Sequence, residues 1–496
     1  MTINAQAKIG ASSTENWNKI QWDLASIEVR RLQMRIAKAT REGRHNKAKA
    51  LQWLLTHSFH TKVLAVKRVV QNNGKKTPGV DKVLWKTSKQ KMNAVTSLKR
   101  QGYTPQPLRR IYIPKKNGKQ RPLGIPTMKD RAMQALHAMA LEPIAETTAD
   151  PNSYGFRAKR SAADAIGHCF YALSRSYAPS WILEGDIKAC FDRIQHSWLL
   201  EHIPMDKSIL NKWLTSGYQE KGILYPTEEG TPQGGVISPI LANMTLDGLE
   251  QVVKLHAKGR NKVHVVRYAD DFIITSSNKA FLENEIKPIV EQFLHERGLE
   301  LSAEKTKITH IQDGFEFLGF NIRKYGRKLL IKPSKRNVKA FLEDIKHTLQ
   351  SSYSISTDIM INNLNPKIRG WANYYQHVVA KKTFSKVDSE IFWMIWRWVK
   401  RRHPQKSAEW RYKKYFRTQG NNRWVFHTLT RDKLGNIKPL DLIKASQTPI
   451  KRHLKVQAQA NPFDSKYEEY FKKREDMRSK SKYRVTGLSE NNLKKA

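Results

Sequence analysis

The chain has 496 residues, with 89 Lys and Arg against 44 Asp and Glu, a formal net charge of +45. This length predicts several domains, and an apolar content of 39% with 13 tryptophans excludes a mostly disordered chain. A charge of this size repels itself unless a polyanion neutralises it, so nucleic acid is the first expected partner, ahead of an anionic membrane surface.

Two cysteines, Cys169 and Cys190, exclude a disulfide framework and a zinc ribbon. The sequence contains no apolar run of about 18 residues and no signal-peptide core near Met1. A soluble, cytoplasmic protein without membrane contact is therefore expected.

The first 60 residues are predicted to be helical, because Ile20, Leu24 and Ile27 recur at helical spacing. Residues 74–79 form a Gly- and Pro-containing loop, and residues 109–114 a strand followed by a basic turn. Helices with short loops are expected from there to about residue 180.

The middle of the chain predicts a carboxylate-bearing sheet. A strand at residues 181–183 leads to Asp186, and two β-rich runs, 263–268 and 272–275, flank the pair Asp270 and Asp271. Between them, residues 231–235 are expected to be a loop. They precede a helix at 238–249 that starts at a Ser-Pro pair.

Asp270 and Asp271 interrupt an apolar hairpin, and Asp186 ends an apolar strand. Adjacent carboxylates repel one another unless a cation neutralises them. Three such groups can hold two Mg²⁺ ions, one for an attacking 3′-hydroxyl and one for a leaving pyrophosphate. Taken alone, an Asp-Asp pair more often belongs to an ordinary turn.

The context favours the metal site. Residues 268–271 (YADD) stand among further blocks in a fixed order: 121–126 (RPLGIP), 154–157 (YGFR), 186–191 (DIKACF), 231–235 (TPQGG), 301–306 (LSAEKT) and 317–320 (FLGF). This ordered set resembles the reverse transcriptases encoded within group II introns. The block ending at residues 75–81 (KKTPGVD) is most similar to the chloroplast-like lineage of that family.

The resemblance implies an α/β (α+β) right-hand polymerase, with fingers and palm built on antiparallel sheet and an α-helical thumb. It implies that Asp186, Asp270 and Asp271 hold the metals and that Lys305 protonates the leaving pyrophosphate. It also implies a set of nucleotide-binding residues. These are Lys115, Arg121 and Arg109 for the triphosphate, Phe191 beneath the sugar as a gate against rNTPs, Gln233 near the 3′-hydroxyl, and Tyr268 at the signature. The alternatives are surface charge for the cations and core packing for Phe191.

The C-terminal third holds more than half of the net positive charge, since residues 321–496 contain 41 Lys and Arg against 14 Asp and Glu, or +27 of the +45. From about residue 334 the pattern is helical, basic and aromatic, and residues 365–375 resemble the start of the family's maturase domain. Helical spacing assigns Trp393 and Trp396 to the core, whereas Tyr374, Tyr412 and Tyr415 could stack on unpaired bases. The expected RNA-binding residues are Arg30, Arg31, Lys75, Lys76, Lys367, Arg369, Arg397, Lys400, Arg401 and Arg402.

The expected domains are a basic helical extension (1–60), fingers (61–180), palm (181–332), thumb and maturase domain (333–465) and a basic tail, interpreted as a remnant of a DNA-binding segment (466–496). Many relatives continue into a cysteine-containing DNA-cutting module. Because no cysteine follows Cys190, second-strand cleavage is not expected.

Two functions fit these features and coexist in the family: an RNA-directed DNA polymerase using dNTPs, and a maturase that binds its own intron RNA and a DNA target. Together they predict splicing and retrohoming by target-primed reverse transcription. The alternative is a free-standing relative that serves DNA repair or phage defence.

Overall fold

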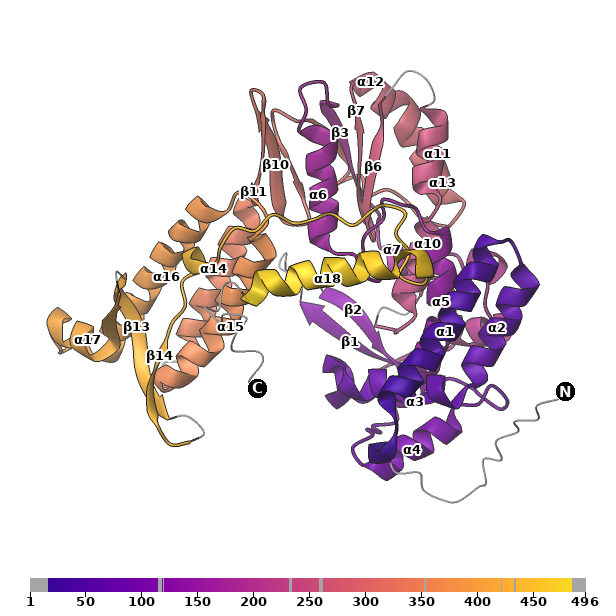
Figure 1. Cartoon of the computed structure of the whole chain (residues 1–496), viewed down its shortest axis with the longest axis horizontal. Helices are drawn as coiled ribbons and strands as arrows, with labels where there is room; N and C mark the ends of the chain where they lie inside the picture. Colours follow the sequence, from indigo (N-terminus) through magenta and orange to yellow (C-terminus); the bar gives the residue numbers. More distant parts are fainter. Residues whose placement is uncertain are drawn as a thin grey trace.

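The structure is a computed structural model that describes residues 17–114, 118, 120–231, 234–257, 262–351, 354–420, 422–431 and 434–483, with side chains described up to residue 477. Figure 1 shows three parts: N-terminal helices at the lower right, a sheet with covering helices at the top, and C-terminal helices with a small sheet at the left. No helix among the described residues is long and apolar enough to cross a membrane.

The N-terminal helices pack on a long buried helix. They are α1 (Trp22–Arg41), α2 (His45–His57) and α3 (Phe59–Gln71), and the buried helix is α5 (Met128–Thr148). The helices confirm the helical prediction for the described part of this segment, but Ala25, Val29 and Ile36 face inward, whereas Leu24 is 44% and Ile27 60% exposed. The short helix η2 (Asn73–Lys76) opens the expected loop, and α4 (Ser88–Ser97) follows.

The fingers carry a four-stranded sheet in the order β2-β1-β4-β5. Its antiparallel pair is β1 (Leu108–Pro114), the predicted strand, with β2 (Gln120–Ile125). Two short strands, β4 (Tyr218–Glu220) and β5 (Ile223–Tyr225), complete it.

The palm sheet has the order β6-β7-β3-β8, with every neighbouring pair antiparallel. Its strands are β3 (Trp181–Asp186), β6 (His264–Tyr268), β7 (Asp271–Ser276) and β8 (Lys307–His310). Residues alternate between two apolar cores: Phe272 and Ile274 face the core shared with the N-terminal helices, whereas Ile273 faces the core shared with the C-terminal helices. The palm sheet is therefore held from both sides.

Several helices cover the palm sheet: α6 (Ala162–Leu173), α10 (Ser238–Leu246), α11 (Leu249–His256) and α13 (Lys287–His295). Pro239 lies in the first turn of α10, as predicted. Shorter elements fill the connections. They are η1 (Trp17–Lys19), α7 (Cys190–Arg193), α8 (His196–His202), α9 (Lys207–Leu214), α12 (Lys279–Phe281) and η3 (Leu282–Ile286).

A second antiparallel sheet joins the palm to the thumb through β9 (Phe315–Phe317), β10 (Phe320–Tyr325) and β11 (Lys328–Pro333). The thumb helices are α14 (Lys335–Gln350), α15 (Thr357–Tyr375), α16 (Lys381–Arg402) and α17 (Ala408–Tyr415).

Two expectations about the thumb are wrong. The chain is not helical throughout from residue 334, because β12 (Phe416–Gln419), β13 (Asn422–Arg431) and β14 (Ile437–Asp441) form a three-stranded sheet. Trp393 is 55% exposed, because Ile391, Ile395 and Trp398 occupy the inward face of α16. Trp396 is partly buried and packs on that core, as expected.

The C-terminal segment returns from the thumb to the palm and fingers. It contains η4 (Ala445–Gln447), η5 (Ser465–Tyr467) and α18 (Glu468–Tyr483), which lies within the segment expected to be a basic tail. The Arg160 guanidinium donates to the carbonyl oxygen of Ala458 at 2.8 Å. Arg474 of α18 donates to Asp164 Oδ1 at 2.5 Å, and both side chains are buried. Residues 484–496 of the expected tail lie outside the described residues.

Candidate active site

The three predicted carboxylates meet at one edge of the palm sheet. Asp186 is the last residue of β3 and stands opposite Asp271, the first residue of β7. Asp270 precedes it in the bend after β6, where Ala269 takes a left-handed conformation (φ +58°). Gly185 is required beside Asp186, since a Cβ there would collide with the ring of Phe272.

The negative charge of the three carboxylates is only partly offset by the positive side chains near them. Partial burial, followed by the charges of Asp270 and Asp186, raises the pKa of Asp271 to about 7. Partial burial also raises the pKa of Asp270, whereas the charges of Arg121 and Lys305 act to lower it. The Lys305 ammonium donates to Asp186 Oδ2 at 2.6 Å. A cation that approached this edge would relieve the remaining repulsion.

The donor set fits a hard divalent ion, because it consists of aspartate oxygens. In the described part of the chain, no group of three or more His, Cys, Asp or Glu side chains already converges on one metal position. The Lys305 ammonium instead sits on Asp186. Metal binding at this edge therefore requires the carboxylates to turn toward a common point, which their shared register allows.

Arg121 and Arg109 lie at opposite ends of the β1–β2 pair. Arg121 stands opposite Ile113, is exposed, and influences the pKa of Asp270, which places it near the carboxylates. Arg109 stands opposite Ile125, four residues along the strand, a separation of about 13 Å. Its charge instead helps to lower the pKa of Arg131, which burial lowers more. The influence on Asp270 thus places Arg121 near the site, whereas the electrostatic contact recorded for Arg109 is with Arg131.

Phe191 and Tyr268 both flank the carboxylate edge. Phe191 lies in α7, is half-buried, and its carbonyl oxygen accepts a hydrogen bond from the backbone N–H of Thr231 at 2.6 Å. Tyr268 ends β6 opposite Asp271 and packs on the thumb core. Lys115 and Gln233, the other two predicted nucleotide contacts, lie outside the described residues.

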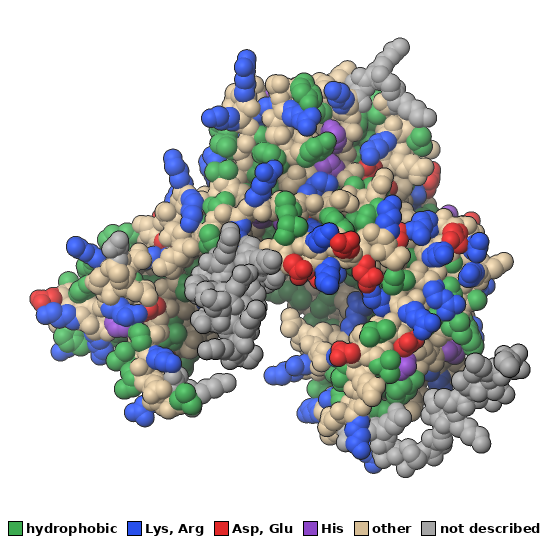
Figure 2. All heavy atoms as spheres, in the orientation of Figure 1, with side chains coloured by type: hydrophobic (Ala, Val, Ile, Leu, Met, Phe, Trp, Pro, Cys, Tyr) green, Lys and Arg blue, Asp and Glu red, His purple; other side chains and the backbone are tan. Residues whose placement is uncertain are grey.

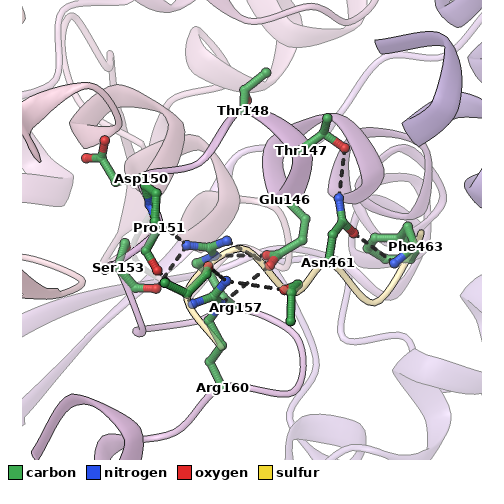
Figure 3. A network of polar contacts seen from close by, with 12 residues as sticks. Glu146, Thr147, Thr148, Asp150, Pro151, Ser153, Arg157, Arg160, Asn461 and Phe463 are labelled. Carbon is green, nitrogen blue, oxygen red and sulfur yellow. Dashed lines mark hydrogen bonds and ion pairs between the residues drawn. The ribbon is translucent and has the colours of Figure 1, made fainter. Parts of the chain in front are cut away.

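Sequence reasoning assigned no role to two buried arginines behind the site. Arg267 of β6 pairs with Asp247, and Arg157 donates to both carboxylate oxygens of Glu146, at 2.9 and 2.7 Å (Figure 3). Arg267 was detectable, because it occupies an inward strand position between valine and tyrosine, where a charge needs a partner. Arg157 stood in a recognised block but without a local pattern that predicts burial.

Three family descriptions match the chain. Residues 113–322 match reverse transcriptase (RNA-dependent DNA polymerase), residues 17–98 the N-terminal domain of reverse transcriptase, and residues 338–416 the group II intron, maturase-specific domain. The chain is 36% identical over 310 residues to protein YkfC of Escherichia coli (strain K12), covering 53% of this chain and 80% of that one. It is 31% identical over 410 residues to the group II intron-encoded protein LtrA of Lactococcus lactis subsp. cremoris, covering 63% and 68%.

The chain belongs to the group II intron-encoded reverse transcriptases and maturases. It is accordingly an RNA-directed DNA polymerase, with the dependence on a divalent metal that this activity carries. The right-hand fold with a mainly helical C-terminal region is confirmed. The telomerase of Candida albicans, solved with a fragment of telomeric RNA, is similar at 13% identity over 62% of this chain and 66% of that one, with a TM-score of 0.36, too low to support an argument.

The predicted RNA-binding residues of this intron-encoded protein fall into two groups. Three of them hold the fold together: Arg30 donates to the carbonyl oxygen of Pro462, Lys367 to Asp344, and Arg402 to the carbonyl oxygen of Ile355. The others are exposed at the surface: Arg31, Lys75, Lys76, Arg369, Arg397, Lys400 and Arg401. On the face shown in Figure 2, Lys and Arg predominate, and acidic side chains gather over α18.

The aromatic candidates also divide. Tyr415 is buried, which argues against base stacking by that ring, whereas Tyr374 is 41% exposed. Tyr412 is partly buried and packs against Trp424, with ring centroids 4.3 Å apart.

Proposed function

We propose that Asp186, Asp270 and Asp271 hold two Mg²⁺ ions and that this edge of the palm is where DNA is synthesised on an RNA template. The pairing of Asp186 with Asp271 across β3 and β7, with Asp270 adjacent, carries the proposal. When bound, such a metal pair supplies the positive charge that activates a 3′-hydroxyl and stabilises the leaving pyrophosphate. Asp186, Asp270 and Asp271 would orient it.

The nucleotide is bound by the residues around this edge. Arg121 supplies a forked cation for the triphosphate near Asp270, and Lys115, Arg109 and Gln233 belong to the same proposed set. Phe191 lies beneath the sugar and excludes a 2′-hydroxyl, with Tyr268 beside it. Lys305 donates a proton to the pyrophosphate, a role that its ammonium, already at the carboxylates, can perform.

The RNA partner is proposed to be a group II intron, bound through the exposed cations of α1, the loop at residues 73–80 and the thumb. Bound in this way, the protein would stabilise the spliceable RNA and promote retrohoming by target-primed reverse transcription into a DNA target. The proposed domain limits are 1–60, 61–180, 181–332, 333–465 and 466–496. The proposed function leaves out second-strand cleavage, since no cysteine of the kind that the family's DNA-cutting module carries follows Cys190 in the sequence.

Purification from the native host followed by sequencing of the bound RNA tests this function. One structured intron, enriched over abundant cellular RNAs, is the expected result, and binding should weaken steeply with salt. RNA in proportion to cellular abundance would contradict the maturase role while leaving the polymerase intact. The variant Asp270→Asn is the matched control, because it should bind the same RNA without copying it.

A further inference from the structure

The loop between α5 and α6 presents an aromatic side chain, Phe156, beside Phe191. Phe156 has a left-handed backbone (φ +57°), which costs a non-glycine residue free energy. Its side chain is 58% exposed, so burial of the ring recovers little of that cost. The rings of Phe156 and Phe191 stand edge to face, with centroids 6.4 Å apart.

The residues before Phe156 clamp the loop against the catalytic hairpin. Tyr154 is buried, and its backbone N–H donates to the carbonyl oxygen of Arg267 at 2.9 Å. A Cβ on Gly155 would collide with the backbone nitrogen of Ala269, in the bend that carries Asp270. The Asn243 side chain donates to the carbonyl oxygen of Gly155 at 2.8 Å.

The residue after Phe156 fixes the other side of the loop. The Arg157 side chain is 6% exposed and, besides its bonds to Glu146, donates to the carbonyl oxygens of Asp150 at 2.6 Å and Ser153 at 2.9 Å (Figure 3). Both neighbours of Phe156 are thus held by close backbone packing or by buried hydrogen bonds. The strained backbone is imposed by its surroundings, and its result is an outward-facing ring at a defined position.

A cavity of about 300 Å³ opens at this ring. Phe156 lines it together with Arg68 of α3 and Arg157, and so do three acidic residues, Glu142, Glu146 and Asp247. Among the described residues, neither the three catalytic-edge aspartates nor Arg121 lines it. Because its carboxylates would repel a phosphate, this cavity is not assigned to a nucleotide, and the inference rests on the exposed ring itself.

We propose that Phe156 contacts the RNA template strand where it pairs with the incoming nucleotide. This inference rests on the proposed place of the sugar at Phe191, whose ring centroid stands 6.4 Å from that of Phe156. An exposed phenyl ring fits the sugar and base edge of a nucleotide.

The test compares Phe156→Ala with Phe170→Ala, a control on α6 that removes an equally large ring, 50% exposed. Phe156→Ala should raise the Kd for RNA template–DNA primer at least fivefold, with the KM for dNTP changed less than twofold. Phe170→Ala should change neither. If Phe156→Ala behaves like the control, the inference is overturned. If only the KM for dNTP rises, the template assignment is overturned and the ring belongs to the nucleotide pocket.

A second variant tests whether the strain serves binding. Phe156→Gly relieves the left-handed conformation, so its Tm should equal or exceed that of the wild type while template binding weakens at least fivefold. A Tm well below that of the wild type would show that the ring stabilises the fold, which contradicts the inference. Failure of the proposed function looks different, because then wild type and Phe170→Ala would also lack template-directed DNA synthesis.

Discussion

Asp164 and Asp271 are both removed from solvent to a large extent, but the groups around them shift the pKa of the two carboxyls in opposite directions. Asp164 is fully buried and accepts hydrogen bonds from Ser161 at 2.7 Å, His453 at 2.8 Å and the backbone N–H of Val456 at 2.7 Å, as well as from Arg474. Burial alone would raise its pKa, but these donors and charges lower the pKa well below its usual range. Asp271 is faced by Asp270 and Asp186, and its pKa rises.

This difference in surroundings distinguishes Asp164, which stabilises the fold, from Asp271, which is available to bind a cation. Asp164 is saturated with donors and joins α6 to the returning C-terminal segment and α18. Asp271 and its neighbours remain short of positive charge, which a proton or an added cation can supply. Burial is common to both sites, so the local balance of donors and charges decides the role.

The largest expected effect is loss of synthesis in Asp270→Asn. We expect primer extension to fall at least about 10³-fold, or about 4 kcal/mol in the activation barrier, because a metal ligand is lost. Thermal stability should stay level or rise, since a repulsive charge is removed. Single-turnover primer extension measures the rate, and thermal unfolding measures the stability. The control is Asp313→Asn, which changes an exposed aspartate. Extension at more than a tenth of the wild-type rate would exclude Asp270 as a ligand.

The opposite pattern is expected at Asp164. Asp164→Asn leaves the buried Arg474 without its charge partner, so the free energy of unfolding should fall by about 3 kcal/mol. Denaturant unfolding measures it, against the same Asp313→Asn control. A loss of free energy of unfolding below about 1 kcal/mol, within the range of ordinary substitutions, would show that Asp164 does not hold α6 and α18 together.

Lys305→Met should lower kcat about tenfold, or about 1.4 kcal/mol, because an ammonium that is 65% exposed is partly replaced by water. The matched control is Lys307→Met, which removes a 61% exposed lysine that pairs with Glu184 one step further from the sheet edge. Steady-state kinetics with saturating dNTP gives kcat. An equal decrease of kcat in the two variants would contradict a role of Lys305 as proton donor.

The last prediction is a pH dependence of stability without metal, read as a direction. Because the pKa of Asp271 is about 7 in the fold and about 3.9 when unfolded, its contribution to the free energy of unfolding is complete below pH 4 and is lost as pH rises through 7. The stability of Asp271→Asn relative to wild type should therefore increase between pH 5 and 8.

Added Mg²⁺ at pH 8 should narrow the Asp271→Asn difference, because a bound cation offsets the same charge. Thermal unfolding at pH 5, 6.5 and 8 checks both points. A difference that does not depend on pH would contradict the raised pKa. At Asp164 the sign is reversed, since a lowered pKa contributes stability above about pH 4 that is lost in acid.

The sequence predicted the local elements of the site well. The hairpin around Asp270 and Asp271 could be predicted because two short β-rich runs flank two carboxylates. The thumb was predicted less well: β13 contains the β-favouring residues Trp424, Val425 and Phe426, but they were included in a basic, aromatic segment interpreted as helical throughout. Trp393 shows the same limit, since a stripe of aromatic residues does not reveal which of them faces inward.

Sequence alone therefore determined the chemistry: which residues could carry negative charge at a bend, which segments carry excess positive charge, and which family the ordered blocks resemble. Tertiary structure decided the proximities. It set Asp186 against Asp271, Arg121 near Asp270, Phe156 beside Phe191, and Arg474 against Asp164 at a separation of 310 residues. Local patterns encode strands and bends through neighbouring side chains, whereas such distant contacts depend on how whole sheets and helices pack.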